Sequence, residues 1–195
     1  MEPNQSDAGG MTLRILDTAE ALLRRHGIEK LNVVDVARAL GMSHGNVYRH
    51  FSSKTALQAA VVHRWLNRVA EQTAAVADRE DPADQRLVEW LRTLAVVKQR
   101  KVTEDAELLN AAVEVVRISP AVQADHAAVL TSQVVGILAA GLADGTLPGV
   151  GAPSATATAI LNATTLYHHP VMVANGGSPD DQLRGLNGVI ALIMA

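Results

Sequence analysis

The chain contains no cysteine among its 195 residues, and only five of its side chains are aromatic. Without thiols, neither a disulfide framework nor a thiolate metal site can form, so a reducing, cytoplasmic location is expected. The first ten residues, MEPNQSDAGG, lack the basic and then apolar order of a signal peptide, and no uninterrupted apolar run reaches the length of a bilayer span. We therefore expect a cytoplasmic protein without a membrane segment.

Strand-like alternation and internal repeats are also missing, whereas apolar residues recur at helical spacing almost throughout. This pattern predicts an all-α fold of about nine helices. Residues 1–11, polar and glycine-containing, are expected to form a disordered tail before a first helix that starts near Thr12. Ser119 with Pro120 and Ser178 with Pro179 predict two later helix starts, and Pro170 is expected to interrupt the helix that begins near Pro153.

The net charge of −3 conceals an uneven distribution. Residues 12–68 hold nine Lys and Arg against four Asp and Glu, which gives +5, and the remainder holds eight against sixteen, which gives −8. Four of the seven histidines also lie in the basic part. This division suggests a small polyanion-binding module joined to a domain that does not bind polyanions.

Two short helices separated by a glycine are predicted between residues 32 and 51. Asn32 can cap the first helix, which stops at Gly41, and Ser43 can cap the second. An apolar seam is expected from Ala37, Leu40, Met42, Val47 and Phe51. Such a pair is a helix-turn-helix, whose second helix can present its N-terminal residues to the major groove of DNA.

The expected exposed start of the second helix carries side chains suited to nucleic acid. Gly45 permits close backbone approach, and His44 and Asn46 can hydrogen-bond to bases or phosphates. Neighbouring Tyr, His and Lys side chains can donate to phosphate oxygens. A solvated helical corner that never touches DNA is the alternative, and the local charge of +5 favours DNA. The predicted DNA-binding set is Asn32, Ser43, His44, Gly45, Asn46, Tyr48, Arg49, His50 and Lys54.

The segment RILDTAEALLRRHGIEKLNVVDVARALGMSHGNVYRHFSSKTAL, residues 14–57, resembles the tetracycline-repressor (TetR) family of transcriptional regulators. The resemblance is strongest in VARALGMSHGNVYRHFSSK, where glycine, tyrosine, phenylalanine and lysine fall at the family spacing. It covers about a quarter of the chain. Asn32 stands where most members have threonine, and Val34 stands where some carry an arginine that reads a base, so that contact is not expected.

The resemblance implies a homodimer with two DNA-binding heads, a ligand pocket in each C-terminal domain, and repression that ends when ligand spreads the heads. It also implies that Tyr48, His50 and Lys54 touch the DNA backbone while residues 44–46 approach the bases. The expected organisation is a head at 12–57, a connecting helix that continues to about 76, and a ligand-binding and dimerisation domain at 77–195. The expected partners are a double-stranded operator and a small-molecule effector.

The eighth and ninth expected helices, which begin near Pro153 and at Ser178, are rich in small and aliphatic residues. From both subunits they would form a four-helix dimer surface, although the same stripes could be intrachain core. The residues concerned are Ala155, Ala157, Ala159, Ile160 and Ala163, and then Leu183, Leu186, Val189, Ile190, Leu192 and Ile193.

A ligand pocket is expected among the helices between the head and the last helix. With few aromatic residues available, an aliphatic or other modest apolar ligand fixed by a few polar groups fits best. The candidate lining residues, each of which could equally be core, are Trp65, Trp90, Leu94, Asn110, Val113, Tyr167, His168 and Met172.

The stretch YHHP, Tyr167 to Pro170, is the most unusual part of the C-terminal half. Pro170 is expected to leave a helix carbonyl without its normal partner, which a histidine or a ligand could satisfy. Adjacent histidines point about 100° apart and do not form a metal pair alone. No phosphate loop, nucleophile elbow or HExxH motif occurs, so no catalytic residue, metal or cofactor is predicted. Two alternatives stay open: a small-molecule-binding or interaction protein without operator binding, and an all-α enzyme that uses His168 and His169.

Overall fold

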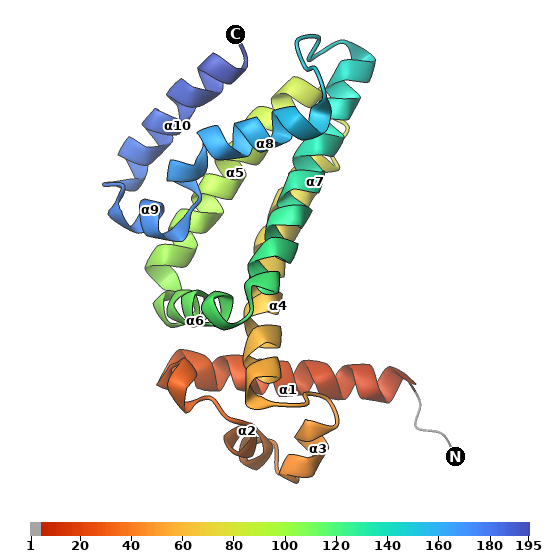
Figure 1. Ribbon diagram of the computed structural model, residues 1–195, viewed down its shortest axis with the longest axis vertical. Coiled ribbons are helices and arrows are strands. Elements are labelled where there is room, and N and C mark those ends of the chain that lie inside the picture. The colour runs from red at the N-terminus through yellow and green to blue at the C-terminus, as the bar shows by residue number, and fades with distance from the viewer. Residues whose placement is uncertain (1–4) are drawn as a thin grey trace. The chain divides into compact units, whose positions relative to one another are not determined.

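The computed structural model describes residues 5–195, and these residues form helices without any strand (Figure 1). The all-α prediction is therefore confirmed. Two short 3-10 helices, η1 and η2, accompany ten α-helices. In chain order the elements are α1 (Gln5–His26), η1 (Ile28–Lys30), α2 (Val33–Ala39), α3 (His44–Tyr48), α4 (Lys54–Ala77), α5 (Ala83–Glu104), α6 (Ala106–Ile118), α7 (Pro120–Asp144), α8 (Pro153–Ala163), η2 (Thr165–Tyr167), α9 (Pro170–Asn175) and α10 (Pro179–Ile193).

The chain divides into two compact units, and neither is one continuous segment. The N-terminal unit contains residues up to Trp65 together with Asp105–Gln123. The C-terminal unit contains Leu66–Glu104 and Ala124–Ala195. The first boundary between the units therefore falls inside α4, and the chain crosses between the units twice more, after Glu104 and after Gln123.

The N-terminal unit is built around apolar side chains of α1, α2, α3 and the start of α4. Ile15, Ala19 and Leu23 of α1 are fully buried, as are Val36 of α2 and Val47 of α3. Their spacing in α1 follows the helical repeat, so one face of the helix supplies the core. This packing holds the two short helices, which are too short to be stable alone.

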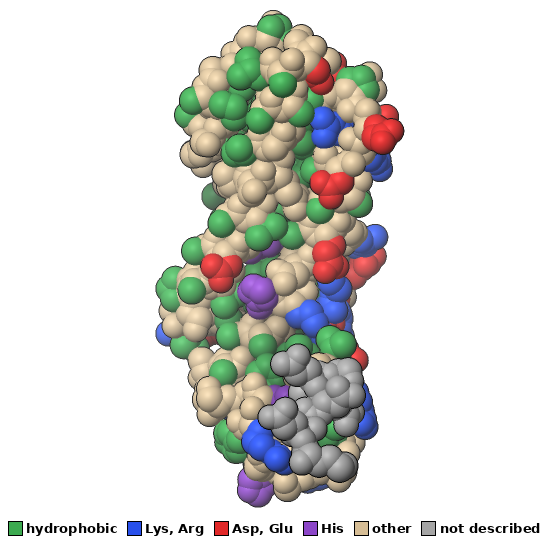
Figure 2. All heavy atoms as spheres, turned by 90° about the vertical axis from the view of Figure 1, so that its right-hand side faces the viewer, with side chains coloured by type: hydrophobic (Ala, Val, Ile, Leu, Met, Phe, Trp, Pro, Cys, Tyr) green, Lys and Arg blue, Asp and Glu red, His purple; other side chains and the backbone are tan. Residues whose placement is uncertain are grey.

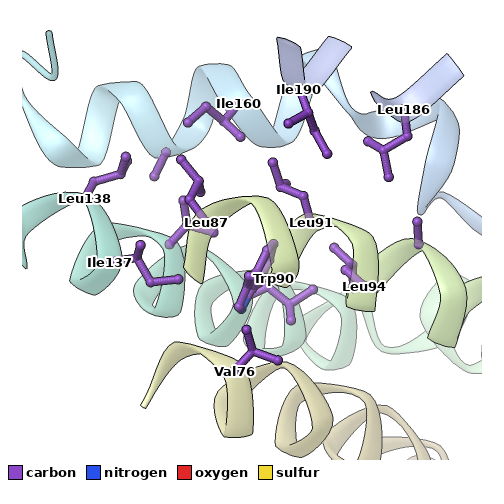
Figure 3. Packing of buried hydrophobic residues seen from close by; sticks show 14 of the residues in the cluster. Val76, Leu87, Trp90, Leu91, Leu94, Ile137, Leu138, Ile160, Leu186 and Ile190 are labelled. Atoms are coloured by element: carbon purple, nitrogen blue, oxygen red, sulfur yellow. The ribbon is translucent and has the colours of Figure 1, made fainter. Parts of the chain in front are cut away.

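The C-terminal unit has its own core, centred on α5. Leu87, Trp90, Leu91 and Leu94 of α5 are almost completely buried, and Figure 3 shows them between α7, α8 and α10. Their partners include Ile137 and Leu138 of α7, Ile160 of α8, and Leu186 and Ile190 of α10. Five of the eleven residues that we considered for the dimer surface thus also serve the intrachain core: Ala157, Ile160, Leu186, Ile190 and Ile193.

One buried polar network joins α4, α5 and α7 inside the C-terminal unit. The side-chain oxygen of Gln133 accepts hydrogen bonds from Thr73 Oγ1 at 2.7 Å and from Trp90 Nε1 at 2.9 Å. Its amide nitrogen donates to the carbonyl oxygen of Ala70 at 2.9 Å. A single amide of α7 therefore bonds to three polar groups on two other helices, α4 and α5.

Two predicted helix boundaries need correction. Helix α1 already begins at Gln5, so residues 5–11 are helical and not a disordered tail; residues 1–4 lie outside the described part. A strongly amphipathic helix can extend through Gly9 and Gly10 despite their low helix propensity. The expected eighth helix ends at Ala163, and Pro170 opens α9 as its first residue. A proline is well suited to that first position, so residues 5–195 form ten α-helices where nine were expected.

Helix α7 is apolar on average, although polar residues interrupt its apolar sequence. It is the one helix among the described residues that is long and apolar enough to cross a bilayer by length and composition, with a mean hydropathy of 1.6 over 18 residues. Core helices of water-soluble proteins meet the same criterion. The apolar character of this helix is not obvious in the sequence because three polar residues, Asp125, His126 and Gln133, interrupt the apolar ones.

Candidate functional site

The helix-turn-helix depends on a glycine with left-handed backbone geometry. Gly41 has φ of 66°, a conformation that costs other residues energy, and it ends α2. The backbone N–H of Met42 then donates to the carbonyl of Ala37 at 3.0 Å, which closes the turn. Val47 and Phe51 are buried beneath it. The predicted apolar seam therefore anchors α3 and leaves its other side to solvent.

The two predicted caps differ in their chemistry. The Asn32 side chain accepts a hydrogen bond from the backbone N–H of Asp35 at 2.9 Å, and its amide donates to the Asp35 carboxylate at 2.6 Å. Asn32 is therefore the cap of α2. Ser43 precedes α3 as its cap residue, but its hydroxyl makes no capping hydrogen bond there. The exposed Ser43 hydroxyl remains available to an outside partner.

The start of α3 exposes the residues that were predicted to read bases. His44, Gly45, Tyr48 and Arg49 are exposed, and Asn46 is half-buried. The Asn46 side-chain oxygen accepts a hydrogen bond from the Arg49 guanidinium, so these two side chains form a pair on the helix surface. Figure 2 shows Lys, Arg and His side chains on the surface of the N-terminal unit, at the lower end of the view.

Two predicted phosphate-contacting residues are held in place within the head. His50 Nδ1 lies 2.9 Å from Thr12 Oγ1, and Lys54 Nζ donates to the carbonyl oxygen of Glu29 at 2.9 Å. An ammonium group has three N–H donors, so Lys54 keeps further donors for a phosphate. Both residues follow α3 in the chain, and their fixed positions reduce the side-chain entropy that a DNA contact would cost.

The predicted ligand residues are divided between the two units. Trp65, Asn110 and Val113 belong to the N-terminal unit, and the other five belong to the C-terminal unit. Trp65 donates its indole N–H to Asp105 at 3.0 Å, and Val113 is exposed. Trp90 and Leu94 are core residues, Tyr167 packs against that core, Asn110 and Met172 are exposed, and His168 is half-buried.

One cluster of titratable groups was not anticipated as a unit. Lys98 of α5 is half-buried, and its Nζ lies 3.0 Å from Nε2 of His126 of α7, which is only 4% exposed. Burial, and then the charge of Lys101, lower the pKa of Lys98 to about 8. Lys98 and His126 are 28 residues apart, so no local sequence signal pairs them.

His168 belongs to the same electrostatic environment. Its Nε2 lies 3.1 Å from the carbonyl oxygen of Leu161, so this nitrogen carries the hydrogen and donates it. A histidine of YHHP thus bonds to a helix carbonyl, but that carbonyl lies near the end of α8 and is not one that Pro170 leaves without its partner; the Thr165 hydroxyl donates to the same oxygen at 3.0 Å. Burial is the main cause that lowers the pKa of His168 to about 4; the Leu161 hydrogen bond opposes it, and the charges of Lys98 and His169 add to it.

Neither metal nor enzyme chemistry gains support from this arrangement. No group of three His, Asp or Glu side chains that could hold a metal ion occurs in the described part of the chain. His168 is committed to the Leu161 carbonyl, and His169 is exposed at the cap position of α9. These two histidines therefore do not converge on a common point.

Comparison with known proteins places both units in one family. Residues 15–61 match the family described as bacterial regulatory proteins, tetR family, and residues 83–184 match the tetracyclin repressor-like C-terminal domain. The second match alone covers more than half of the chain. Both descriptions are those of regulatory proteins.

Relatives and solved structures agree with this result. An uncharacterized HTH-type transcriptional regulator of Mycobacterium tuberculosis is 36% identical over 86 residues, which are 44% of this chain and 43% of the relative. The match thus spans less than half of that relative's length. A TetR-family regulator of Mesorhizobium loti has a TM-score of 0.71 at 16% identity, with 98% of both chains covered.

A second solved structure is FadR of Thermus thermophilus, described as a TetR-family repressor in complex with lauroyl-CoA. It has a TM-score of 0.65 at 17% identity and covers 94% of this chain and 95% of its own. At such low identity the solved structures show a common fold alone. The fold and the two family matches together establish that this chain belongs to the TetR family.

Proposed function

We propose that this protein is a ligand-responsive, DNA-binding transcriptional repressor that acts in the cytoplasm as a homodimer on a pseudo-palindromic operator. TetR-family regulators bind DNA and small-molecule effectors, typically as dimers. The observation that carries the proposal is the start of α3, where polar side chains are exposed above a fully buried apolar anchor at Val47. The local charge of +5 supports an anionic partner.

The proposed division of labour follows the predicted domains. Residues 12–57 act as the head, and residues 77–195 bind the effector and the second subunit. Helix α4, which runs from Lys54 to Ala77, connects them. DNA and effector would favour different separations of the two α3 helices, so each ligand would weaken binding of the other.

We propose α8 and α10 as the dimer surface. On α8, Ala155, Ala159 and Ala163 are exposed at four-residue intervals, while Ala157 and Ile160 point into the intrachain core. Leu192 of α10 is 80% exposed. Small side chains permit close helix approach, and an exposed leucine gains stability when a partner covers it.

Selection of bound sequences from random duplex DNA, with the full chain at near-physiological salt, tests the central proposal. Recovery of an inverted repeat would support a dimeric, sequence-specific regulator. Binding without sequence preference that disappears as salt rises would contradict it. The selected site could then serve to screen for effectors that release the protein.

Gly45→Ala is expected to separate folding from DNA binding. A methyl group at Gly45 would meet no atom closer than Ser43 Oγ at 4.0 Å, so the fold accepts it. Removing a helical glycine should leave the free energy of unfolding unchanged or raise it by about 0.5–1 kcal/mol. If the DNA backbone or bases approach Gly45 closely, operator affinity should fall roughly tenfold or more, which corresponds to about 1.4 kcal/mol.

Gly136→Ala is the matched control for this experiment, because that helical glycine on α7 also has open space around its Cα. It should preserve operator affinity. Equal affinities for the Gly45→Ala and wild-type proteins, measured by fluorescence anisotropy, would remove Gly45 from the DNA interface.

Asn46→Ala and Lys54→Ala are expected to differ in their dependence on sequence. A bidentate base contact by Asn46 would make its loss cost about 1–3 kcal/mol on the selected operator and little on random DNA. Lys54 contacts phosphates in this proposal, so its loss should weaken binding to both DNAs similarly and reduce the salt dependence. A parallel loss on both DNAs for both variants would exclude Asn46 as a base reader.

A further inference from the structure

A side-chain hydrogen bond links Asn46 of α3 to Arg49, the residue that follows this helix. The two residues are three positions apart, so their side chains are neighbours on one helix face. The Arg49 guanidinium donates to the Asn46 side-chain oxygen. Because a guanidinium can only donate, the amide has to turn its oxygen toward Arg49 and its nitrogen away from it. The bond therefore sets the direction in which Asn46 presents its N–H groups.

Both side chains keep N–H donors that no other described residue uses. Within residues 5–195, the Asn46 side-chain nitrogen donates to no acceptor, and it is not one of the buried polar atoms. Arg49 is exposed, has five N–H donors, and pairs with no carboxylate of the same residues. Its positive charge also repels an outside N–H donor that approaches the Asn46 oxygen. Toward a partner outside the helix, the pair therefore acts as a set of donors.

The base edges in the major groove differ in how well they match such a set. Guanine offers two acceptors there, N7 and O6, whereas adenine offers the acceptor N7 beside a donating amino group. An asparagine with both sides of its amide available matches adenine, because it donates to N7 and accepts from the amino group. With Arg49 at its oxygen, Asn46 keeps only the donating side. The pair therefore matches guanine and disfavours adenine.

We propose that Arg49 is a specificity-determining residue, which orients the Asn46 amide so that Asn46 reads guanine in preference to adenine. The inference rests on the proposed function, because it requires α3 to lie in the major groove of an operator. Val47, fully buried between the two residues in sequence, anchors the helix that carries them. The hydrogen bond orders the amide before DNA arrives, which lowers the entropy cost of the base contact.

The first experiment locates the base pair that Asn46 contacts, with the full chain and the selected operator. It is the position at which Asn46→Ala removes the preference among the four base pairs. In fluorescence anisotropy titrations, the wild-type protein should bind guanine at this position roughly tenfold or more tightly than adenine. Replacing that guanine with 7-deazaguanine, which lacks the N7 acceptor, should weaken binding by the wild-type protein and leave Asn46→Ala unaffected.

Arg49→Met tests the orienting role directly. Without the guanidinium the amide can present its oxygen as well, so the preference for guanine over adenine should fall to within about threefold or reverse. In the free protein, the side-chain N–H resonances of Asn46 should also shift. Arg117→Met is the matched control, because Arg117 is an exposed arginine of α6 that bonds to Glu114 three positions away. It should retain the wild-type base preference and the Asn46 resonances.

Three results would overturn the inference while leaving the proposed function intact. They are an operator with adenine at the Asn46 position, an unchanged preference for guanine in Arg49→Met, and a loss in Arg49→Met that is equal for all four base pairs. The last result would make Arg49 a phosphate contact. Failure of the proposed function is distinguishable, because the wild-type selection would then yield no sequence preference at all, and both proposals would fall.

Discussion

Lys98→Met is expected to have a higher free energy of unfolding than the wild-type protein at pH 7. The difference between the two proteins should fall by about 2–3 kcal/mol as the pH rises to 10.5, because the wild-type protein gains stability. The pKa of Lys98 falls from 10.5 to about 8 on folding, so the unfolded chain holds the proton more tightly. Below pH 8 this difference destabilises the folded wild-type protein, and between pH 8 and 10.5 the penalty disappears. The lower end of the range allows for water that reaches the half-buried side chain.

Urea unfolding of both proteins across this pH range measures the effect as a double difference, in which the titration of other groups cancels. Lys30→Met is the control for the loss of one positive charge. Unpairing of His126 Nε2 in Lys98→Met adds a cost that the pH series does not contain, so the pH dependence is the diagnostic result. A constant difference between the two proteins from pH 7 to 10.5 would show that Lys98 is well solvated.

Gln133→Leu is expected to destabilise the protein by about 2–4 kcal/mol. Its oxygen accepts from Thr73 and Trp90, and its nitrogen donates to Ala70, so three hydrogen bonds disappear together. Thr73 can still donate to the Ala70 carbonyl at 3.0 Å, whereas the buried indole N–H of Trp90 has no such alternative among its hydrogen bonds. The cost should therefore come mainly from Trp90.

A double-mutant cycle with Trp90→Phe tests this assignment, because phenylalanine removes the N–H donor. Gln133→Leu should cost distinctly less in that background. Gln123→Leu makes the same chemical change at an exposed position of α7 and should remain within about 0.5 kcal/mol of wild type. If Gln133→Leu lowers the free energy of unfolding equally in the wild-type and Trp90→Phe backgrounds, the hydrogen bond to Trp90 does not cause the loss.

Local signals predicted the helix starts well because capping is decided by a few neighbouring residues. Asn32 caps α2 and Ser178 caps α10 through the backbone N–H three residues later, and Pro120 begins α7 as expected. The apolar seam under α3 was also predictable, since Val47 is buried by its spacing along one face. These features give the helix-turn-helix and the exposed polar start of α3.

Features that depend on distant residues were not predictable in the same way. Pro170 was expected to break a helix, but a helix that had already ended at Ala163 made it the first residue of a new one. Lys98 and His126 meet across two helices, and their residue types carry no periodic signal for that meeting. The expected ligand residues stay a prediction, because apolar spacing identifies buried faces and does not distinguish a pocket wall from core; Trp90 and Leu94, for example, are core residues.

The N-terminal unit is built from two separate chain segments, and this affects how the head can be transferred between proteins in evolution. The chain passes between the units after Trp65, after Glu104 and after Gln123. Asp105, supplied by the later segment, accepts hydrogen bonds from Trp65 and from Arg24. Recombination that moved only the first 65 residues to another protein would remove the Asp105 carboxylate to which both side chains donate. The head and the 105–123 segment are therefore expected to be exchanged as a pair, so a change at Asp105 in evolution requires a matching change in α1 or α4.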